Sequence, residues 1–493
     1  MTQSRSLSRR AFVRLAAGTT AFAALGLFGC AAPRTTVSST PSQTVTCDVL
    51  VVGAGAAGTS AALQAASAGA HTILIDKAAW QSGSSALAIG TLYGAGTQLQ
   101  KAQGIDDTPE ALLAYFMTRG GDKLDPAMQK FCAEHFGETI DWLQTLGVPF
   151  KEEVSPKGSD TVPRGHSIDD RDEVALAAVT QAAKDAGVQF VFNTEADSLI
   201  VSDDGAVEGV MALEGHRNLI EYQAKRTILA TGGFCRNDEM IAEYCPDYKG
   251  VYTEVSPGCT GEGLQMGLDI GAAYLGHGGT NGILACPVEA GQSKLIDKKA
   301  LWINSDGKRF VNEDGQTHDV YYTVAHFPDQ AFYAVYDQAM VDALDDKLAA
   351  AFQMGLDKGY FAKGDTVAEA ADKLKVDGAA AQKQLEAYNA LAKAGSDTEY
   401  GKKAENLVVL DKAPYYVLTM GVCTHGSFGG YHVNTDFEVL DEEEQVIPGL
   451  YAVGEVSCGS FIYDDYPAGG CGLNYAYTSG RFAGQNAAEA VQA

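Results

Sequence analysis

The sequence has no closely paired cysteines. Its ten cysteines stand at positions 30, 47, 132, 235, 245, 259, 286, 423, 458 and 471, and no two have the CxxC spacing. This absence argues against a zinc ribbon, a thioredoxin-like redox pair and a CxxCH haem attachment site, and we expect no metal site. Because the cysteines are widely scattered, we interpret most of them as small buried apolar residues rather than as a disulfide framework.

Basic residues are also scarce. Lys and Arg number 36 against 63 Asp and Glu, which gives a formal charge of -27 at pH 7. Such a charge repels a phosphate backbone, so nucleic acid is not expected as a partner. In contrast, 55 glycines predict many tight turns, and 493 residues exceed what one hydrophobic core usually organises. We therefore predict more than one domain.

The chain has no hydrophobic run long enough for a stable membrane span. The uncharged stretch 15–29 follows Arg9-Arg10, and this arrangement in residues 1–30 is typical of a twin-arginine export signal. Cys30 ends a sequence that resembles a lipobox, so either a lipid anchor at Cys30 or cleavage near Ala31 is expected. Residues 31–45 are rich in Ser, Thr and Pro and predict a linker. The expected location is the periplasm or the outer face of the cytoplasmic membrane.

A dinucleotide-binding pattern begins after this linker. The apolar strand predicted at Asp48–Val52 runs into a GxGxxG sequence, and an alanine-rich helix follows to about Ala68. The glycines allow a tight turn, a close approach to a pyrophosphate and close packing of helix on strand. A second strand, Thr72–Ile75, ends at an acidic residue suited to ribose hydroxyls. The residues assigned to this part of the site are Gly53, Gly55, Ala57, Gly58, Asp76 and Lys77.

Further glycine-rich turns follow at intervals along the chain. They are Ser82–Ala86 with Gly90, Ala230–Phe234, Thr260–Gly263, Gly449–Glu455 and Gly469–Leu473. In this order they resemble the FAD-dependent fumarate reductase, urocanate reductase and 3-oxosteroid dehydrogenase superfamily, from about Cys47 to Ala488. The resemblance implies FAD as the cofactor. It assigns to the flavin site Ser84, Ser85, Gly90, Ala196, Ala230, Thr231, Gly232, Glu262, Gly454, Glu455, Gly472 and Leu473.

The resemblance also implies the fold class and domain order. We expect an α/β fold with a Rossmann-type FAD-binding domain, formed by residues 46–270 and 406–493, and an inserted α+β capping domain at 271–405. In the cap, Leu301–Asn304 and Lys308–Glu313 predict two strands joined by a turn. Helices are expected from about Val320 and within 366–374 and 378–392. A mobile cap would exclude water during hydride transfer.

Two departures from the family pattern concern arginines. Fumarate reductases of the family carry an arginine proton donor at the position of Thr317 in this chain, and an arginine that clamps a substrate carboxylate at the position of Pro467. Without the two arginines a dicarboxylate lacks its bidentate partners, so fumarate is not the expected substrate. His318, or Tyr321 one helical turn further on, is the candidate replacement for the proton donor.

The residues around Pro467 resemble a different branch of the superfamily. Tyr466 and Gly470 match the YPxxG element of 3-oxosteroid dehydrogenases, in which a tyrosine hydroxyl and a glycine N–H bind a ketone oxygen. His425 resembles a family histidine that contacts substrate or flavin. Arg164 and His166 stand in a polar stretch and could line the cleft, but we interpret them as surface residues.

Three functional hypotheses follow from the resemblance. The first is an exported reductase of a C=C bond conjugated to a carbonyl or aromatic group, working in anaerobic respiration with hydride from flavin N5 and electrons from a separate cytochrome or flavoprotein. The second is a 3-oxosteroid dehydrogenase working in the opposite direction. The third is an exported flavoprotein without catalysis.

Overall fold

The computed structural model describes residues 40–120, 123, 125–289, 293–463 and 465–492. The predicted export signal, the lipid-anchor candidate Cys30 and most of the predicted linker lie outside the described residues. Within them, no helix is both long and apolar enough to cross a membrane.

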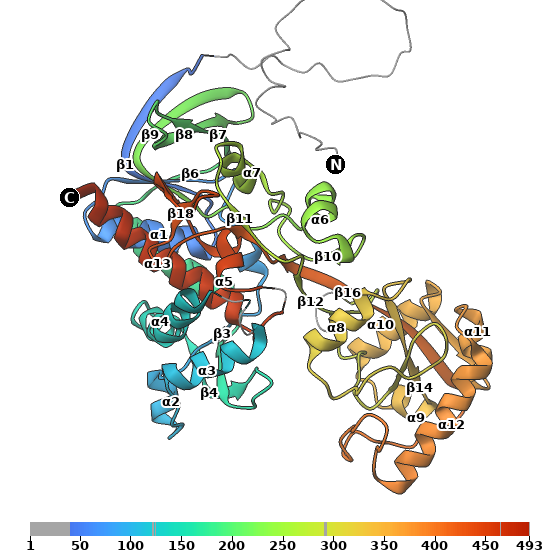
Figure 1. Cartoon of the computed structure of the whole chain (residues 1–493). Helices are drawn as coiled ribbons and strands as arrows, with labels where there is room; N and C mark the ends of the chain where they lie inside the picture. Colours follow the sequence, from blue (N-terminus) through green and yellow to red (C-terminus); the bar gives the residue numbers. More distant parts are fainter. Residues whose placement is uncertain (1–39, 121–122, 124, 290–292, 464, 493) are drawn as a thin grey trace, which may run out of the picture. The chain divides into compact units, whose positions relative to one another are not determined.

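A large sheet forms the base of the cofactor-binding part, with the strand order β18-β19-β9-β1-β2-β6 (Figure 1). These strands are β1 (Gln43–Val52), β2 (Thr72–Ile75), β6 (Gln189–Val191), β9 (Asn218–Leu229), β18 (Glu438–Leu440) and β19 (Val446–Ala452). The pairs β19-β9, β9-β1, β1-β2 and β2-β6 are parallel. Two further strands extend the sheet: β8 (Val207–Glu214) pairs antiparallel with β9, and β7 (Thr194–Val201) pairs antiparallel with β8. The predicted Rossmann-type arrangement is confirmed, and β1 begins five residues before the predicted strand at Asp48–Val52.

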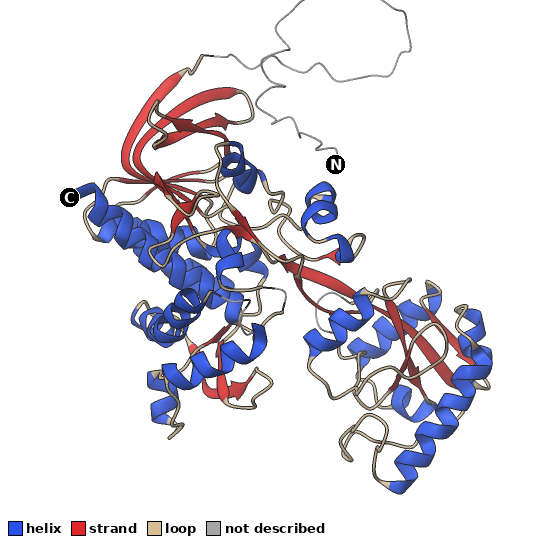
Figure 2. Cartoon of the chain, in the orientation of Figure 1, coloured by secondary structure: helices blue, strands red, loops and turns tan. Residues whose placement is uncertain are grey.

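The two ends of the described chain meet through two helices. α1 (Ala56–Ser67) packs against α13 (Cys471–Gln492), as Figures 1 and 2 show. A Cβ added to Gly480 or to Gly484 would lie 2.1 Å from the carbonyl oxygen of Ala57 or Ala61, respectively. Glycine at both positions therefore permits backbone contact between the helices, and this contact joins the segments that the sequence separates.

A second sheet has the order β10-β16-β14-β13, with β12 and β15 also paired to β16. Its strands are β10 (Tyr252–Thr253), β12 (Thr280–Ala285), β13 (Leu301–Ile303), β14 (Ala331–Tyr336), β15 (Phe361–Gly364) and β16 (Tyr415–Ser427). The helices in this region are α8 (Thr317–Ala325), α9 (Gln338–Asp342), α10 (Asp346–Asp357), α11 (Val367–Lys373) and α12 (Gly378–Ala394). A separate core, which includes Leu301, Val335, Leu385 and Val417, stabilises the predicted cap.

The long strand β16 belongs to both regions. Its first half pairs with β14 from Tyr416 to Gly421, and its second half pairs with β12 and β10 up to Ser427. One continuous strand thus leads from the core of the predicted cap to the glycine-rich segment near the cofactor turns.

The remaining elements surround the predicted flavin turns. The helices are α2 (Gln98–Ala102), α3 (Pro109–Gly120), α4 (Pro126–Thr145), α5 (Asp172–Asp185), α6 (Asp238–Tyr244) and α7 (Glu262–Asp269), with short 3-10 helices at Ser84–Leu87, Pro246–Tyr248 and Gly454–Ser460. One small sheet has the order β3 (Thr91–Tyr93), β5 (Pro163–Ile168), β4 (Phe150–Pro156), and the other pairs β11 (Tyr274–Leu275) with β17 (Gly430–Tyr431). The nine described cysteines are free and buried, which confirms their interpretation as apolar residues.

One predicted strand of the cap is wrong. The segment Lys308–Glu313 forms no strand, and only an isolated bridge joins Arg309 to Ile303. The guanidinium of Arg309 instead turns inward to Glu313 and Asp397, at 2.7 Å from each carboxylate, with all three side chains fully buried. A buried arginine needs such partners, and the pairing overrides the alternating pattern that predicted a strand. α8 also begins three residues before the expected Val320.

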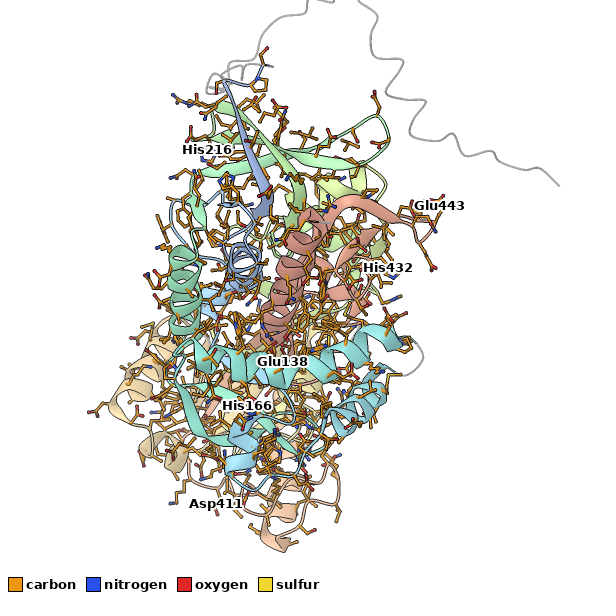
Figure 3. The ribbon with its side chains drawn as sticks, turned by 90° about the vertical axis from the view of Figure 1, so that its left-hand side faces the viewer. Glu138, His166, His216, Asp411, His432 and Glu443 are labelled. Atoms are coloured by element: carbon orange, nitrogen blue, oxygen red, sulfur yellow. The ribbon has the colours of Figure 1, made fainter. Side chains whose placement is uncertain are left out.

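The interpretation of Arg164 and His166 as surface residues is also wrong. Both lie on β5 and are buried, and Figure 3 labels His166. The guanidinium of Arg164 donates to both carboxylate oxygens of Asp107 at 2.8 Å and to Asp160 at 2.6 Å. His166 Nε2 lies 2.8 Å from Thr97 Oγ1. Partners distant in sequence satisfy these polar groups, so the polar character of the segment did not indicate exposure.

Asp172, at the start of α5, provides a prediction of pH-dependent stability. Tyr477 donates to its Oδ1 at 2.9 Å, whereas its Oδ2 has no hydrogen-bond partner among the described residues. Burial raises the pKa of Asp172 from 3.8 to about 7. Because the folded state then holds a proton that the unfolded state has lost, stability falls as the pH rises through this interval.

We expect this carboxyl to cost the wild-type protein ~2 kcal/mol of unfolding free energy between pH 5 and pH 7. Asp172→Asn should remove that part of the pH dependence, because the amide does not ionise. Urea unfolding of both proteins at the two pH values measures the difference. An identical loss of stability in the variant would show that Asp172 is not the titrating group.

Candidate active site

The turn after β1 has the geometry of a nucleotide-binding loop. Gly53 has φ of 109°, and a Cβ added to Gly58 would lie 1.9 Å from the carbonyl oxygen of Gly53. Only glycine fits such a close approach of strand and helix. The N–H groups of Ala54 and Ala78 each donate to one carboxylate oxygen of Asp76 at 2.7 Å. Asp76 is therefore fixed at the turn, with remaining lone pairs available to hydroxyl donors.

The first turn of α1 supplies donors for an anion. Its N-cap, Gly55, has no side chain to cap the helix, and the hydroxyl of Ser85 accepts from Ala56 N–H at 3.1 Å. A helix N-terminus of this kind favours negative charge, because the first amides have no partner within the helix. A pyrophosphate fits this turn, and Ala57 and Gly58 belong to it as predicted.

The segments predicted to reach the flavin from the second half of the chain also meet here. Glu455 accepts from the N–H and the hydroxyl of Ser427, at 2.8 and 3.1 Å. A Cβ on Gly233 would lie 2.0 Å from Glu455 Oε1, and burial raises the pKa of Glu455. Gly454 N–H donates to Ser479 of α13 at 3.0 Å, and its own Cβ would lie 2.8 Å from that of Ala57. The predicted turns therefore converge on one region.

Other predicted cofactor residues surround the same turns. Lys77 Nζ lies 2.9 Å from Glu262 Oε2 and 2.7 Å from the hydroxyl of Thr260, so two of the predicted residues pair with each other. The hydroxyl of Ser84 lies 3.2 Å from Cys259 Sγ, and Gly232, with φ of 74°, faces the same thiol. The second flavin turn is thus in contact with the serine loop.

The remaining predicted cofactor residues are described by their backbone hydrogen bonds, their φ angles and their place in the fold. Ala230 N–H donates to the carbonyl of Val52 at 2.8 Å and leads into Thr231. Ala196 follows Thr194, whose N–H donates to the carbonyl of Asp76 at 2.9 Å. Gly90 has φ of 75°. Gly472 and Leu473 lie in the first turn of α13.

A cleft lies beside the first turn of α13, and Tyr466 and His318 both line it. Its lining residues are Arg119, Lys157, Ser159, Gln316, His318, Asp319, Tyr466, Pro467 and Ala468. They come from the end of α3, the segment after β4, the start of α8 and the loop before α13. The structure thus brings together the two residues that the sequence placed nearest to the chemistry.

The ring of Tyr466 is held on two sides. It stacks on Phe428 with centroids 5.9 Å apart, and it lies 5.0 Å from the ring of His318. Its hydroxyl accepts from Gly472 N–H at 2.8 Å. Gly470, two residues earlier, has φ of 104°, and its Cβ would lie 2.8 Å from the carbonyl oxygen of Thr91. The hydroxyl and the first amides of α13 are therefore neighbours, as an oxyanion site requires.

His318 stands at the second position of α8, and its Nε2 lies 3.1 Å from Asn281 Oδ1. Burial lowers the pKa of His318 to about 4, and the charge of Arg119 adds to this shift. A helix N-terminus also disfavours a cation. At neutral pH His318 is therefore an uncharged hydrogen-bonding group beside Tyr466.

Tyr321 does not reach the cleft. Its side chain is fully buried, its hydroxyl lies 2.6 Å from that of Thr280, and its ring stacks on Tyr248 at 5.9 Å. The hydroxyl of Tyr321 is therefore paired with Thr280 of β12, and Tyr321 is not among the residues that line the cleft. The hypothesis that Tyr321 replaces the missing proton donor is therefore not supported.

Arg119 and Lys157 are cationic residues of the cleft that the motifs did not reveal. Arg119 Nη2 lies 2.7 Å from Asp465 and 3.8 Å from Asp319, so two carboxylates offset its charge. Neither cation stands in a recognisable motif, and only the meeting of α3 with α8 and the 466–468 loop places Arg119 at this cleft. Its position at the end of a helix is the one sequence signal, since cations are favoured there.

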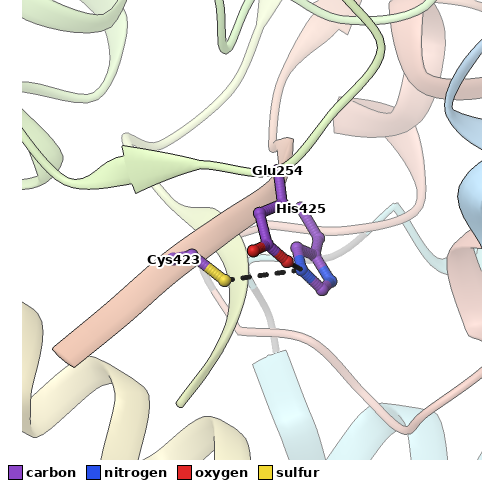
Figure 4. Close-up of side chains that lie close together, drawn as sticks. All are labelled: Glu254, Cys423 and His425. Carbon is purple, nitrogen blue, oxygen red and sulfur yellow. Dashed lines mark hydrogen bonds and ion pairs between the residues drawn. The ribbon is translucent and has the colours of Figure 1, made fainter. Parts of the chain in front are cut away.

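His425 lies on β16 and is not among the residues that line this cleft. Its Nε2 is 3.5 Å from Glu254 Oε2 and 3.5 Å from Cys423 Sγ. Figure 4 shows the three side chains close together. No sequence pattern connects Glu254 with the other two residues, because 168 residues separate it from Cys423. The side chain is thus partnered by an acid and a thiol.

Residues 48–473 match the family described as an FAD binding domain. The chain belongs to this FAD-binding family. It is 31% identical over 463 residues to a fumarate reductase (cytochrome) of Shewanella frigidimarina, covering 92% of this chain and 78% of that protein. It is 30% identical over 485 residues to the vinyl phenol reductase of Lactiplantibacillus plantarum, covering 90% and 96%.

A solved structure of 3-ketosteroid-Δ4-(5α)-dehydrogenase from Rhodococcus jostii has a TM-score of 0.75 to this chain at 26% identity, over 90% of this chain and 97% of that one. These similarities confirm FAD as the cofactor, the α/β fold with a capping domain, and an FAD-dependent reductase family. Reductases among the relatives of this FAD-binding protein do not favour the hypothesis of a flavoprotein without catalysis.

Proposed function

We propose that this FAD-binding protein reduces a C=C bond conjugated to an uncharged carbonyl or an aromatic ring, and that fumarate is a poor substrate. The observation that carries the proposal is the composition of the cleft at Tyr466. Pro467 lines it where the family resemblance places a carboxylate-clamping arginine, and an aromatic ring and a neutral imidazole stand beside it.

The charges around the cleft also favour an uncharged substrate. Arg119 and Lys157 are its cations, and Asp319 and Asp465 offset them, so the four charges sum to zero. Arg119 is already paired with Asp465 at 2.7 Å. A dicarboxylate would have to displace that carboxylate to gain a bidentate partner, whereas a neutral enone or vinyl arene needs no such exchange.

The residues of this chain have separate tasks in the proposed reaction. When bound and reduced, FAD supplies the hydride. Tyr466 and the amide of Gly470 polarise the oxygen that conjugates with the double bond, and the stacked rings of Tyr466 and Phe428 exclude water from one side. Neutral His318 orients the substrate by hydrogen bonding, and a proton from solvent completes the reduction at the second carbon.

We also propose that the protein works outside the cytoplasmic membrane, exported by the twin-arginine route and either anchored at Cys30 or free. Its electrons are proposed to come from a separate cytochrome or flavoprotein. The sequence pattern at Arg9-Arg10 and the lack of any CxxCH among the ten cysteines support these two proposals.

The test is reoxidation of the reduced flavin. The holoprotein is reduced anaerobically with an artificial donor and mixed with 4-vinylphenol, cyclohexenone, a cinnamate, a 3-oxosteroid enone or fumarate, and the return of oxidised flavin absorbance is followed. We expect at least one neutral conjugated alkene to react about a hundredfold faster than fumarate. Rapid reoxidation by fumarate alone, or by none of the alkenes, would contradict the proposal.

A dehydrogenase acting on 3-oxosteroids is the second candidate, supported by the steroid dehydrogenase structure and by the Tyr466-Gly470 spacing. It predicts the opposite result in a matched experiment. Oxidised holoprotein mixed with a saturated 3-oxosteroid would lose its oxidised flavin absorbance, and a quinone would restore it. The first proposal predicts no bleaching in that mixture.

The proposed role of Asp76 at the ribose gives a binding prediction. Asp76→Asn replaces one of two acceptor oxygens by a donor that faces an amide N–H, so we expect the dissociation constant of FAD to rise about tenfold. Quenching of FAD fluorescence on titration of the apoprotein measures it. Asp48→Asn is the control. Asp48 likewise accepts a backbone N–H, that of His71 just before β2, at 2.9 Å. Equal affinity of the Asp76 variant and the wild type would exclude the role.

A further inference from the structure

Among the described residues, Glu254, Cys423 and His425 form a group whose carboxylate, thiol and imidazole ligand atoms all lie within 4.8 Å of one another (Figure 4). We propose that these three side chains bind one zinc-like divalent ion, with a fourth coordination position left to water or another oxygen ligand. The proposal rests on the geometry of these three side chains and does not depend on the proposed function, and it assigns His425 to an ion instead of the substrate or flavin contact that the family resemblance implied.

Strand pairing explains why the three side chains meet. Cys423 and His425 are two residues apart on β16, so they point to the same face of the strand. β10 runs parallel to β16, with Tyr252 beside Cys423 and Thr253 beside Thr424. Glu254 follows β10, and its N–H donates to the carbonyl of Thr424 at 3.0 Å. The backbone holds all three ligands in place before any ion enters.

The distance from His425 to Glu254 fits coordination better than a direct hydrogen bond, and the distance from His425 to the sulfur of Cys423 is compatible with both. Around a tetrahedral ion bound at about 2.0–2.3 Å, neighbouring ligand atoms are about 3.3–3.7 Å apart. His425 Nε2 lies 3.5 Å from both Cys423 Sγ and Glu254 Oε2. A hydrogen bond between imidazolium and carboxylate would be nearer ~2.8 Å. The imidazole therefore stands at a tetrahedral edge length from each partner.

Burial and ligand chemistry point to the kind of ion. The thiol of Cys423 is fully buried, whereas the side chains of His425 and Glu254 are 31% and 25% exposed. An ion can thus enter past the imidazole and carboxylate and reach a shielded sulfur. Thiolate with imidazole selects zinc and its neighbours over magnesium or calcium, which prefer oxygen ligands. Binding breaks the S–H bond of Cys423, forms a sulfur–metal bond and releases one proton to solvent, with no electron transfer.

Gly426 of β16 connects the proposed metal site with the cleft. Gly426 follows His425 and pairs with Asn281 of β12, and Asn281 is the residue that lies 3.1 Å from His318. An ion held here would be close to the polar side of the cleft. The sequence alone predicted no metal site, because a ligand set contributed by two paired strands has no motif spacing.

The experiment uses untagged holoprotein freed of metal by a chelator and titrated with Co²⁺, followed by Zn²⁺. We expect one Co²⁺ per chain, with a thiolate-to-cobalt absorption and ligand-field bands at wavelengths longer than those of oxidised flavin. Zn²⁺ should remove these bands, and one proton per chain should appear in unbuffered solution. Binding that is weak, of higher stoichiometry and without a thiolate band would overturn the proposal, since it would reflect the many surface carboxylates.

Variants assign the ligands. Cys423→Ser and Glu254→Gln should each weaken Co²⁺ binding by about a hundredfold, and Cys423→Ser should abolish the thiolate band. Cys47→Ser is the matched control, because Cys47 is also buried and its thiol lies 3.8 Å from the carbonyl of Gln223. The FAD content of each protein shows that it is folded. If Cys423→Ser loses FAD, Glu254→Gln decides. Wild-type affinity in that variant would refute the site.

Discussion

Replacement of Tyr466 by Phe should lower the turnover number of alkene reduction by about a hundred- to a thousandfold, while leaving FAD content unchanged. Phe retains the stacking on Phe428 at 5.9 Å and the contact with the ring of His318 at 5.0 Å, so the cleft should keep its shape. What disappears is the hydroxyl, which lies 2.8 Å from Gly472 N at the start of α13. A loss of this size is typical when one donor to a developing oxyanion is removed.

The matched control is Tyr475→Phe. Tyr475 is also buried, and its hydroxyl donates to the carbonyl of Ser457 at 3.1 Å, away from the residues that line the cleft. Its loss should leave turnover within about twofold, because it removes only ordinary internal hydrogen bonds to Ser457. Stopped-flow reoxidation of reduced flavin by the best alkene measures both variants. If Tyr466→Phe reacts as fast as Tyr475→Phe, Tyr466 has no part in the chemistry.

Replacement of Arg309 by Met should destabilise the folded protein by about 3–5 kcal/mol. The guanidinium of Arg309 is fully buried and donates to Glu313 at 3.1 and 2.7 Å and to Asp397 at 2.7 Å. Met fills a similar volume but leaves both carboxylates desolvated, and only Lys402, 3.6 Å from Glu313, remains as a cation. Removing one partner of a buried ion network costs more than the network contributes by itself.

Urea unfolding followed by intrinsic fluorescence measures the effect. The control is Lys373→Met, which breaks an ion pair to Glu369 of 2.9 Å on the exposed side of α11. Exposed pairs of this kind contribute about 0–1 kcal/mol, so the control should unfold almost as the wild type does. A similar small change for both variants would mean that the Arg309 cluster is hydrated rather than buried.

Much of the cofactor site could be predicted from the sequence. The glycines at 53, 55 and 58, the strand before them and Asp76 after the second strand are local features, because the backbone of a tight turn tolerates few other residues. The structure agrees with them through the Ala54–Asp76 hydrogen bond and the positive φ of Gly53. The turns at 230–233 and 454–455 were expected from their resemblance to a family, and they meet as that resemblance implied.

The errors concern polar residues whose partners are far away in the sequence. Arg164 and His166 were expected at the surface, and Arg309 within a strand, because a local pattern does not reveal a carboxylate 57 or 88 residues away. The same limit hid Arg119 in the cleft and misdirected Tyr321, whose distance from His318 suggested the same helix face but whose hydroxyl pairs with Thr280.

The sequence by itself determined the cofactor and the parallel nucleotide fold, since each depends on residue types at fixed short spacings. Only the tertiary structure decided which side chains line the cleft at Tyr466 and which could hold a metal. Those sets are assembled from α3, α8, β10, β16 and the loop before α13, and their chemistry depends on distance and burial. Neither quantity is encoded in a local run of residues, because both are set by packing between segments hundreds of residues apart.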